Sequence, residues 1–124
     1  MKTENVEVKL TFKAEDVADA LVTAIEGGTS YWRLFKGTKK SVPNKYPDKS
    51  RAENLVAYVM EDGGEITVVD CDDTEDVLGL FNMKNIKRGL KLFIEDGRSF
   101  DAAMDADDAD VLFQFMIMGE IVYG

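Results

Sequence analysis

The segment Val111–Met118 constrains the fold more than any other part of this sequence. It is apolar at every position except Gln114. Aspartates cluster just before it, in the range 105–110, and Gly119 follows it. Acids stabilise the N-terminal end of a helix, glycine commonly ends one, and a helix that is apolar nearly all round must be covered by other elements. The sequence therefore predicts a helix over Ala109–Met118 that is the most buried element of the fold and too short to cross a bilayer.

Periodic patterns predict the remaining elements. Apolar and polar residues alternate over Val6–Phe12, which predicts a half-buried strand. Apolar residues at helical spacing follow, and Gly27-Gly28 ends that helix. Ser50 and Glu53 have the spacing of a capping box, which predicts the start of another helix. We also expect a strand over Ile66–Val69 and a helix over Met83–Asp96 that is capped by Asn82. The tail Ile121–Tyr123 can extend a sheet edge, and Val77–Phe81 is undecided between strand and loop.

The order of these elements, β-α-loop-α-β-α-α, predicts an α+β fold. We expect a single compact domain over residues 1–124, in which about four helices cover one face of a small sheet of short strands. A chain of 124 residues can bury a sufficient core without disulfides or a structural metal. Gly37, Pro43 and Pro47 stand among lysines, so we expect a mobile basic loop at about 36–49.

The composition excludes several classes of function. The sequence has no histidine, which removes histidine-dependent nucleophilic catalysis and the commonest zinc ligand. Its net charge of −9 argues against direct binding to nucleic acid, because phosphate affinity depends on clustered lysines and arginines. A single cysteine and the absence of a visible signal peptide predict a cytoplasmic protein. We expect no cofactor, no metal and no membrane association.

Two groups of aspartates are candidates for an acidic interaction surface. The first follows the strand over Ile66–Val69, and the second opens the buried helix. Solvated loops and ordinary helix starts also account for such groups. The candidate residues are Asp70, Asp72, Asp73, Asp105, Asp107 and Asp108.

The sequence from Asp70 to Thr74 also resembles the nucleophile motif of haloacid-dehalogenase-type phosphatases. In that motif the first aspartate attacks phosphorus, the second is the acid/base, and magnesium bridges the pair. A magnesium-dependent phosphatase that uses Asp70 and Asp72 is therefore a remote alternative. Those enzymes place the motif near the start of a doubly wound parallel sheet, whereas only about fifty residues follow it here. Because a motif needs its structural context, an acidic turn is the preferred interpretation.

A second candidate site follows the first helix and combines a flexible turn with adjacent aromatic residues. It consists of Gly27, Gly28, Tyr31, Trp32 and Arg33. The aromatic rings can stack on a planar ligand or anchor a partner protein, and the arginine can grip a phosphate or a carboxylate. The competing interpretation is that Trp32 packs in the core.

Three segments of the chain resemble a family of small bacteriophage and prophage proteins that has no established activity. They are Val22–Gly28 with Tyr31-Trp32, the segment Ile86–Leu90, and the end of the chain, where Asp105–Asp110 is followed by Gln114 and by Gly119–Gly124. The resemblance implies a phage-encoded accessory protein that acts in the bacterial cytoplasm. It implies no catalytic residue.

The sequence thus favours a small, acidic, non-catalytic accessory protein that binds a host bacterial protein, in a role such as counter-defence or nucleic-acid mimicry. The absence of a complete catalytic set and the net charge of −9 support this interpretation. The alternative is a protein that binds a small nucleotide-like ligand through Tyr31, Trp32 and Arg33.

Overall fold

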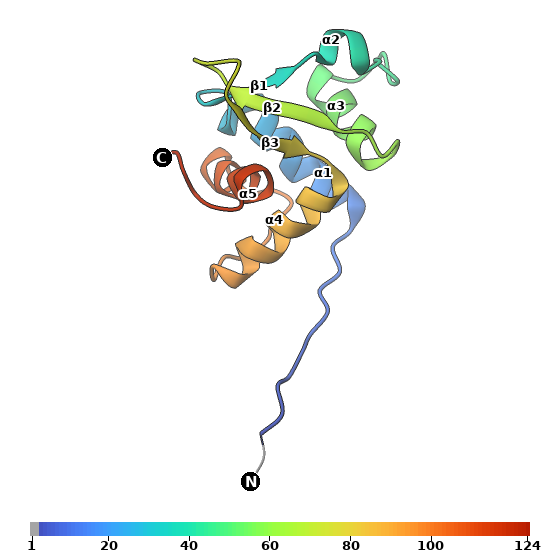
Figure 1. The fold of residues 1–124 in the computed structure, drawn as a ribbon. Coiled ribbons are helices and arrows are strands. Elements are labelled where there is room, and N and C mark those ends of the chain that lie inside the picture. Colours follow the sequence, from blue (N-terminus) through green and yellow to red (C-terminus); the bar gives the residue numbers. More distant parts are fainter. Residues whose placement is uncertain (1–2) are drawn as a thin grey trace.

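Residues 3–124 are described by a computed structural model, in which helices pack on a small sheet of short strands (Figure 1). The elements are α1 (Ala14–Thr23), the π-helical turn η1 (Ala24–Gly28), β1 (Arg33–Lys36), α2 (Thr38–Ser41), α3 (Arg51–Met60), β2 (Ile66–Asp70), β3 (Val77–Phe81), α4 (Met83–Glu95) and α5 (Ala106–Met118). The expected α+β class is confirmed. Among the described residues, no helix is both long enough and apolar enough to span a membrane.

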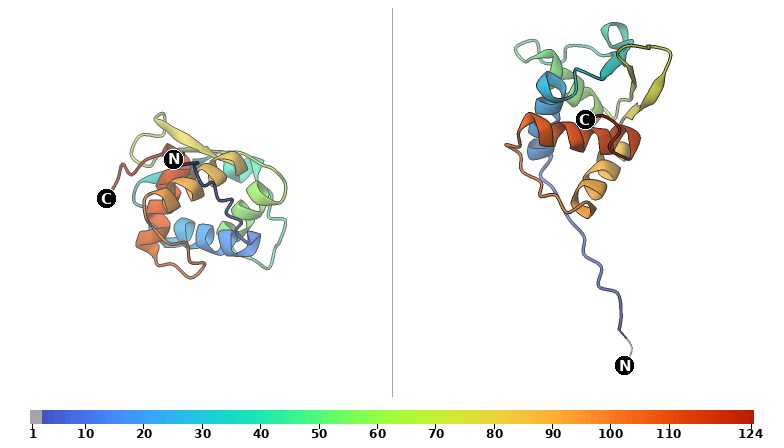
Figure 2. Two further views of the ribbon diagram at one scale, coloured as in Figure 1. Left: turned by 90° about the horizontal axis from the view of Figure 1, so that it is seen from below. Right: turned by 90° about the vertical axis from the view of Figure 1, so that its left-hand side faces the viewer.

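The sheet has three antiparallel strands in the order β1-β2-β3. The central strand β2 contributes Ile66, Val68 and Val69 to the core. Helices α1, α4 and α5 gather on one side of this sheet (Figures 1 and 2). The segment Val77–Phe81, undecided from the sequence, is the strand β3, and β1 is a strand that the sequence pattern did not predict.

The helix α5 is the centre of the core, as its apolar pattern predicts. Its six consecutive residues from Leu112 to Ile117 are all buried. The Asp105 side chain caps its N-terminus by accepting a hydrogen bond from the Asp108 amide at 2.9 Å. Gly119 ends it with a φ of 77°, a left-handed conformation that suits glycine. Gly89 of α4 allows the two helices to approach closely, because a Cβ there would lie 2.6 Å from the Met116 Cα.

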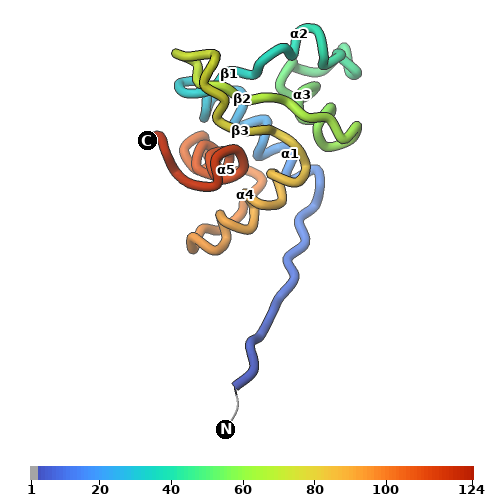
Figure 3. The backbone as a smooth tube through the Cα atoms, viewed as in Figure 1, coloured from blue at the N-terminus to red at the C-terminus, as the bar shows by residue number. Residues whose placement is uncertain are grey.

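The N-terminal segment contradicts the prediction of a strand over Val6–Phe12. Residues 3–13 form no regular secondary structure, and they extend away from the rest of the protein (Figure 3). Val6 is 88% exposed and Val8 is 75% exposed. Only at its end does the segment pack, where the Phe12 ring contacts the Phe100 ring edge-to-face at 5.1 Å. Alternation predicts which residues suit a strand, but a strand also needs a neighbour, and the described residues of this chain provide none.

Two predicted helix starts are confirmed. The capping box at the start of α3 is complete, since the Glu53 amide donates to the Ser50 hydroxyl and the Ser50 amide donates to the Glu53 carboxylate. Asn82 caps α4 by accepting a hydrogen bond from the Asn85 amide at 2.8 Å. Local capping chemistry therefore fixes both helix starts.

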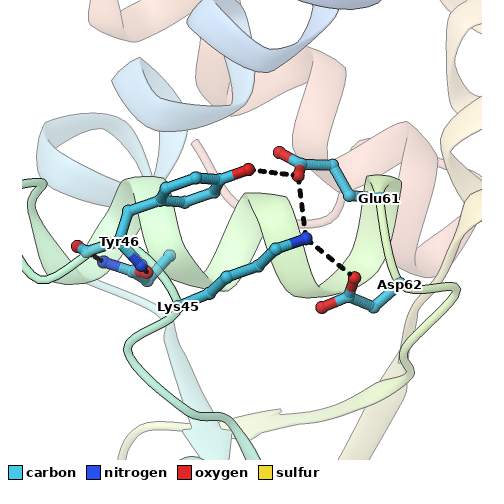
Figure 4. Close-up of polar contacts among 5 residues, drawn as sticks. Lys45, Tyr46, Glu61 and Asp62 are labelled. Atoms are coloured by element: carbon cyan, nitrogen blue, oxygen red, sulfur yellow. Dashed lines mark hydrogen bonds and ion pairs between the residues drawn. The ribbon is translucent and has the colours of Figure 1, made fainter.

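The basic segment 36–49 contains more structure than the sequence suggests. It includes the short helix α2, and the Val42 side chain is buried. Figure 4 shows how the segment is tied to the end of α3. The Lys45 Nζ lies 3.1 Å from both the Glu61 and the Asp62 carboxylates, and the Tyr46 hydroxyl donates to Glu61 at 2.6 Å. Mobility of this loop stays a prediction, and the buried Val42 shows that the segment also contributes to the core.

Candidate functional site

Trp32 lies in the core and not on the surface. Its side chain is only 2% exposed. Its ring stacks on the Tyr123 ring with the centroids 5.2 Å apart and the planes 11° from parallel. Its indole N–H donates to the Asp110 carboxylate at 2.8 Å. Of the two interpretations that the sequence left open, the structure supports the core one, and Trp32 offers no free face to a ligand.

Asp110 is the residue around which this site is organised, and no sequence pattern distinguishes it from the other aspartates in the range 105–110. Its Oδ2 accepts a hydrogen bond from the Tyr31 hydroxyl at 2.5 Å, and its Oδ1 accepts bonds from the Trp32 indole and from the Gln114 amide at 3.0 Å. Both carboxylate oxygens are therefore used. The single polar residue in the apolar run of α5, Gln114, was the sequence signal for this network.

The two glycines of the turn have different roles. Gly28 lies against the start of α5, because a Cβ at this position would be 2.6 Å from the Ala106 carbonyl oxygen and 3.3 Å from the Asp110 amide nitrogen. A Cβ on Gly27 would meet no atom of the described residues within 4 Å. Only Gly28 is thus needed for the close approach of η1 to α5.

Arg33 is committed to contacts inside the protein. Its Nε donates to the Thr29 hydroxyl at 2.8 Å, and its Nη2 donates to the Ile25 carbonyl oxygen. The guanidinium also lies over the Phe35 ring, 4.4 Å from the centroid. Burial lowers the pKa of Arg33 from its usual range. This arginine fixes the turn between η1 and β1, and two of its three guanidinium nitrogens are already engaged within the protein.

The C-terminal tail does not extend the sheet as expected. It runs back along α5, where the buried Gln114 side chain holds it. The Gln114 Oε1 accepts hydrogen bonds from the amides of Val122 and Tyr123, both at 2.8 Å. The Tyr123 hydroxyl then donates to Asp70 at 3.0 Å. A side-chain amide in the helix thus satisfies the backbone groups that a sheet edge would otherwise have satisfied.

Tyr31 and Tyr123 connect two acidic groups on one face of the protein. Tyr31 donates to Asp110 in α5, and Tyr123 donates to Asp70 at the end of β2. The Cys71 thiol donates to the Tyr31 carbonyl oxygen at 3.3 Å, which brings the β2–β3 turn against Tyr31. We call this region the acidic face. It comprises Tyr31, Asp70, Asp72, Asp107, Asp110 and Tyr123, and its elements are seen from the front in the right-hand view of Figure 2.

The negative charge of the acidic face appears in the pKa values of its tyrosines. Partial burial, the hydrogen bond to Asp110 and the nearby charges of Asp110 and Asp107 raise the pKa of Tyr31 to about 12. Burial and the hydrogen bond to Asp70 raise the pKa of Tyr123. The Asp72 amide, followed by the Tyr123 hydroxyl, donates to the Asp70 carboxylate and lowers its pKa.

Only some of the six candidate aspartates have carboxylates that are free to bind a partner. Asp105 caps α5, Asp73 accepts a hydrogen bond from the Glu75 amide at 3.2 Å, and Asp108 lies 4.0 Å from the Arg98 guanidinium. Asp72 and Asp107 are exposed, and their carboxylates accept no hydrogen bond from the described residues. The acidic face therefore presents two free carboxylates in addition to the exposed ring of Tyr31.

The phosphatase-like motif lacks the context that its chemistry needs. One ligand atom each from Asp70, Cys71 and Asp72 lies within 4.8 Å of the others. Both oxygens of Asp70, however, accept hydrogen bonds, one from the Asp72 amide and one from the Tyr123 hydroxyl. The motif also follows the central strand of an antiparallel sheet and not a strand of a parallel one. An acidic turn describes these residues better than a nucleophile site.

Comparison of the chain with protein-family models, with curated proteins and with solved structures found no match.

The raised pKa of Tyr31 can be measured directly. We expect one of the four tyrosines to ionise at about pH 12, well above the usual value of 10, and this transition to be absent in Tyr31→Phe. Because the folded pKa exceeds the unfolded one, the contribution of Tyr31 to stability is complete below about pH 10 and is lost as the pH rises towards 12. Tyrosinate absorbance measures the ionisation. Ionisation of every tyrosine at the usual pH would contradict the Tyr31–Asp110 hydrogen bond.

Proposed function

We propose that this protein is a non-catalytic accessory protein, of bacteriophage or prophage origin, that binds a basic surface of a host bacterial protein in the cytoplasm. The observation that carries the proposal is the acidic face, where Tyr31 donates to Asp110 of α5, Cys71 donates to the Tyr31 carbonyl oxygen, and Tyr123 of the C-terminal tail donates to Asp70 of β2. A role such as counter-defence or nucleic-acid mimicry fits a face of this kind, because its carboxylates can occupy a groove that otherwise binds phosphates.

Tyr31 has the properties of an interface anchor. Its side chain is 54% exposed, so it offers a large apolar ring to a partner. Its hydroxyl is held by Asp110, so the ring loses little conformational freedom on binding. Rigid aromatic residues of this kind often contribute a large part of the binding energy in protein interfaces.

The charges around Tyr31 select the kind of partner. Asp72 and Asp107 add two exposed carboxylates, and the whole chain has a net charge of −9. Such a field attracts a basic surface and repels nucleic acid. The partner that fits best is therefore a protein with a positively charged groove.

Two of the three segments behind the phage-protein resemblance, the turn after α1 and the end of the chain, meet in this region. Gly28 packs on the start of α5, Trp32 stacks on Tyr123, and Gln114 holds the tail. These contacts explain why a glycine, a tryptophan and a glutamine stand at these positions. The same packing shapes the acidic face. These two segments and the proposed interaction surface thus pack against each other.

The nucleotide-binding alternative is less well supported. It requires Trp32 to stack on a base and Arg33 to bind a phosphate. Trp32 is buried against Tyr123, and the Arg33 guanidinium is bonded to Thr29 and Ile25. Trp32 is not available without a rearrangement of the core, and Arg33 would have to break its bonds to Thr29 and Ile25.

A charge-matched pair of variants tests the proposal. The triple variant Asp72→Asn, Asp73→Asn and Asp107→Asn removes three negative charges from the acidic face and its edge. The change at position 73 keeps a side-chain oxygen that can accept the hydrogen bond from the Glu75 amide. We expect this variant to bind the protein that the wild type captures from bacterial lysate about tenfold or more weakly at low salt. Each lost charge pair contributes about 1 kcal/mol or more to the binding free energy. Capture by the wild type should weaken as salt is added.

The control triple variant Glu15→Gln, Asp48→Asn and Glu95→Gln removes the same charge from exposed sites on α1, the basic segment and α4. It should capture the same protein as the wild type. Equal loss in both triple variants would show that only net charge matters. Undiminished, salt-insensitive capture by the first triple variant would exclude the acidic face as the interaction surface.

A further inference from the structure

The segment 3–12 has the composition of a strand and no partner within the described part of its own chain. Its backbone makes no hydrogen bond to the backbone of the described residues. Val6, Val8 and Leu10 are all exposed, on a segment that extends away from the helices (Figure 1). A segment with the alternation of a strand, unpaired backbone groups and an exposed apolar side favours pairing with another chain.

We propose that residues 4–12 pair with the same residues of a second copy of this chain and form a two-fold symmetric antiparallel ribbon centred on Val8. In this register Val8 lies opposite its own copy, and Val6 lies opposite Leu10. The three apolar side chains of each copy then share one face of the ribbon, because residues directly opposite each other in an antiparallel pair point to the same side.

Charge complementarity selects this register. Glu7 of each copy lies opposite Lys9 of the other, which gives two attractive cross-strand pairs on the polar face. Moving the centre by one residue in either direction places Glu7 opposite Glu7 or Lys9 opposite Lys9. Registers centred between two residues put apolar side chains opposite polar ones and lose the apolar face. The register centred on Val8 alone combines an apolar face with charge pairs at its middle.

The structure also supplies a cover for the apolar face. A two-stranded ribbon is marginal in water unless its apolar side packs on something. A groove of about 520 Å³ opens where the segment leaves the folded part of the chain, and it is lined by Val8, Leu10, Met60, Met83, Ile86 and Leu90. In the proposed register Val6 of the second copy lies beside Leu10, at the wall of this groove. Each copy would therefore fill the groove of the other.

Charge reversal tests the pairing without disturbing the folded part. Sedimentation equilibrium across micromolar to millimolar concentrations should show a reversible dimer for the wild type. Glu7→Lys and Lys9→Glu should each weaken it by about tenfold, since each turns two attractive pairs into repulsive ones. The double variant Glu7→Lys/Lys9→Glu should restore the wild-type dimer, because the pairs reform with exchanged signs.

Two further variants separate this dimer from other assemblies. Val8→Glu places two carboxylates at the symmetry axis and should leave a monomer. Val77→Glu makes the same change at an exposed valine of β3, 56% exposed, and should leave the dimer intact. A wild type that is monomeric throughout, a dimer that survives Val8→Glu, or a monomer whose segment 3–12 is protected from hydrogen exchange would each overturn the proposal.

Discussion

Trp32→Ala is expected to lower the free energy of unfolding by about 3–5 kcal/mol. The substitution leaves a cavity beside Phe113 and Tyr123, whose ring centroids lie 6.1 and 5.2 Å from that of the indole. It also removes a hydrogen bond from the Asp110 carboxylate. Urea-induced unfolding followed by circular dichroism measures the change. A loss this large is a substantial part of the ~5–15 kcal/mol typical of a domain of this size.

A neighbouring residue provides the control for this prediction. Leu34→Ala truncates a large side chain two positions along, but that side chain is 44% exposed. It should cost less than about 1 kcal/mol, mainly through lower strand propensity. If Trp32→Ala leaves the unfolding midpoint unchanged, the indole does not pack as described. If Trp32→Ala is unfolded from the outset, Trp32→Phe, which keeps much of the ring area, provides the measurable intermediate case.

Gly28→Ala is expected to destabilise the fold by about 1–3 kcal/mol. The new methyl group would meet the Ala106 carbonyl oxygen at 2.6 Å, and backbone cannot move aside as a flexible side chain can. The helix η1 would have to shift away from α5, which weakens the contacts that hold Tyr31 and Trp32 against Asp110. Thermal unfolding of the purified variant measures the loss.

Gly27→Ala is the matched control, since it makes the same chemical change one residue earlier. A methyl group there meets no described atom within 4 Å. Alanine is favoured over glycine in helical backbone by about 0.5–1 kcal/mol, so this variant should be as stable as the wild type or slightly more stable. Equal destabilisation by the two substitutions would mean that the turn needs backbone freedom and not close approach.

The elements that the sequence predicted correctly are those whose signals are local. The N-caps Ser50 and Asn82 and the apolar run of α5 each act within a few residues. The failures depend on partners distant in sequence. Val6–Phe12 has the pattern of a strand without a neighbouring strand, and β1 is a strand because Leu34 pairs with Val69. Pattern alone contains no information on pairing over such separations.

The candidate site shows the same division. The sequence identified the glycines and Trp32 as a group, and it left open whether the indole is exposed or buried. The answer depends on Asp110 and Tyr123, which lie 78 and 91 positions further along the chain. A single polar residue in an apolar helix, Gln114, was the only local sign that α5 organises a buried hydrogen-bond network. The roles of the acids could be assigned only when their partners were known.

Cys71 makes the acidic face accessible to spectroscopy. It is the only cysteine of the sequence, its side chain is partly exposed, and its sulfur lies beside the Tyr31 carbonyl. One nitroxide or fluorophore per chain would therefore attach next to the proposed interaction surface. The β2–β3 turn that follows it lies at the opposite end of the molecule from the segment 3–12 (Figure 1). In a dimer held by that segment, the two labels would be far apart, and their measured separation would give the relative orientation of the two acidic faces.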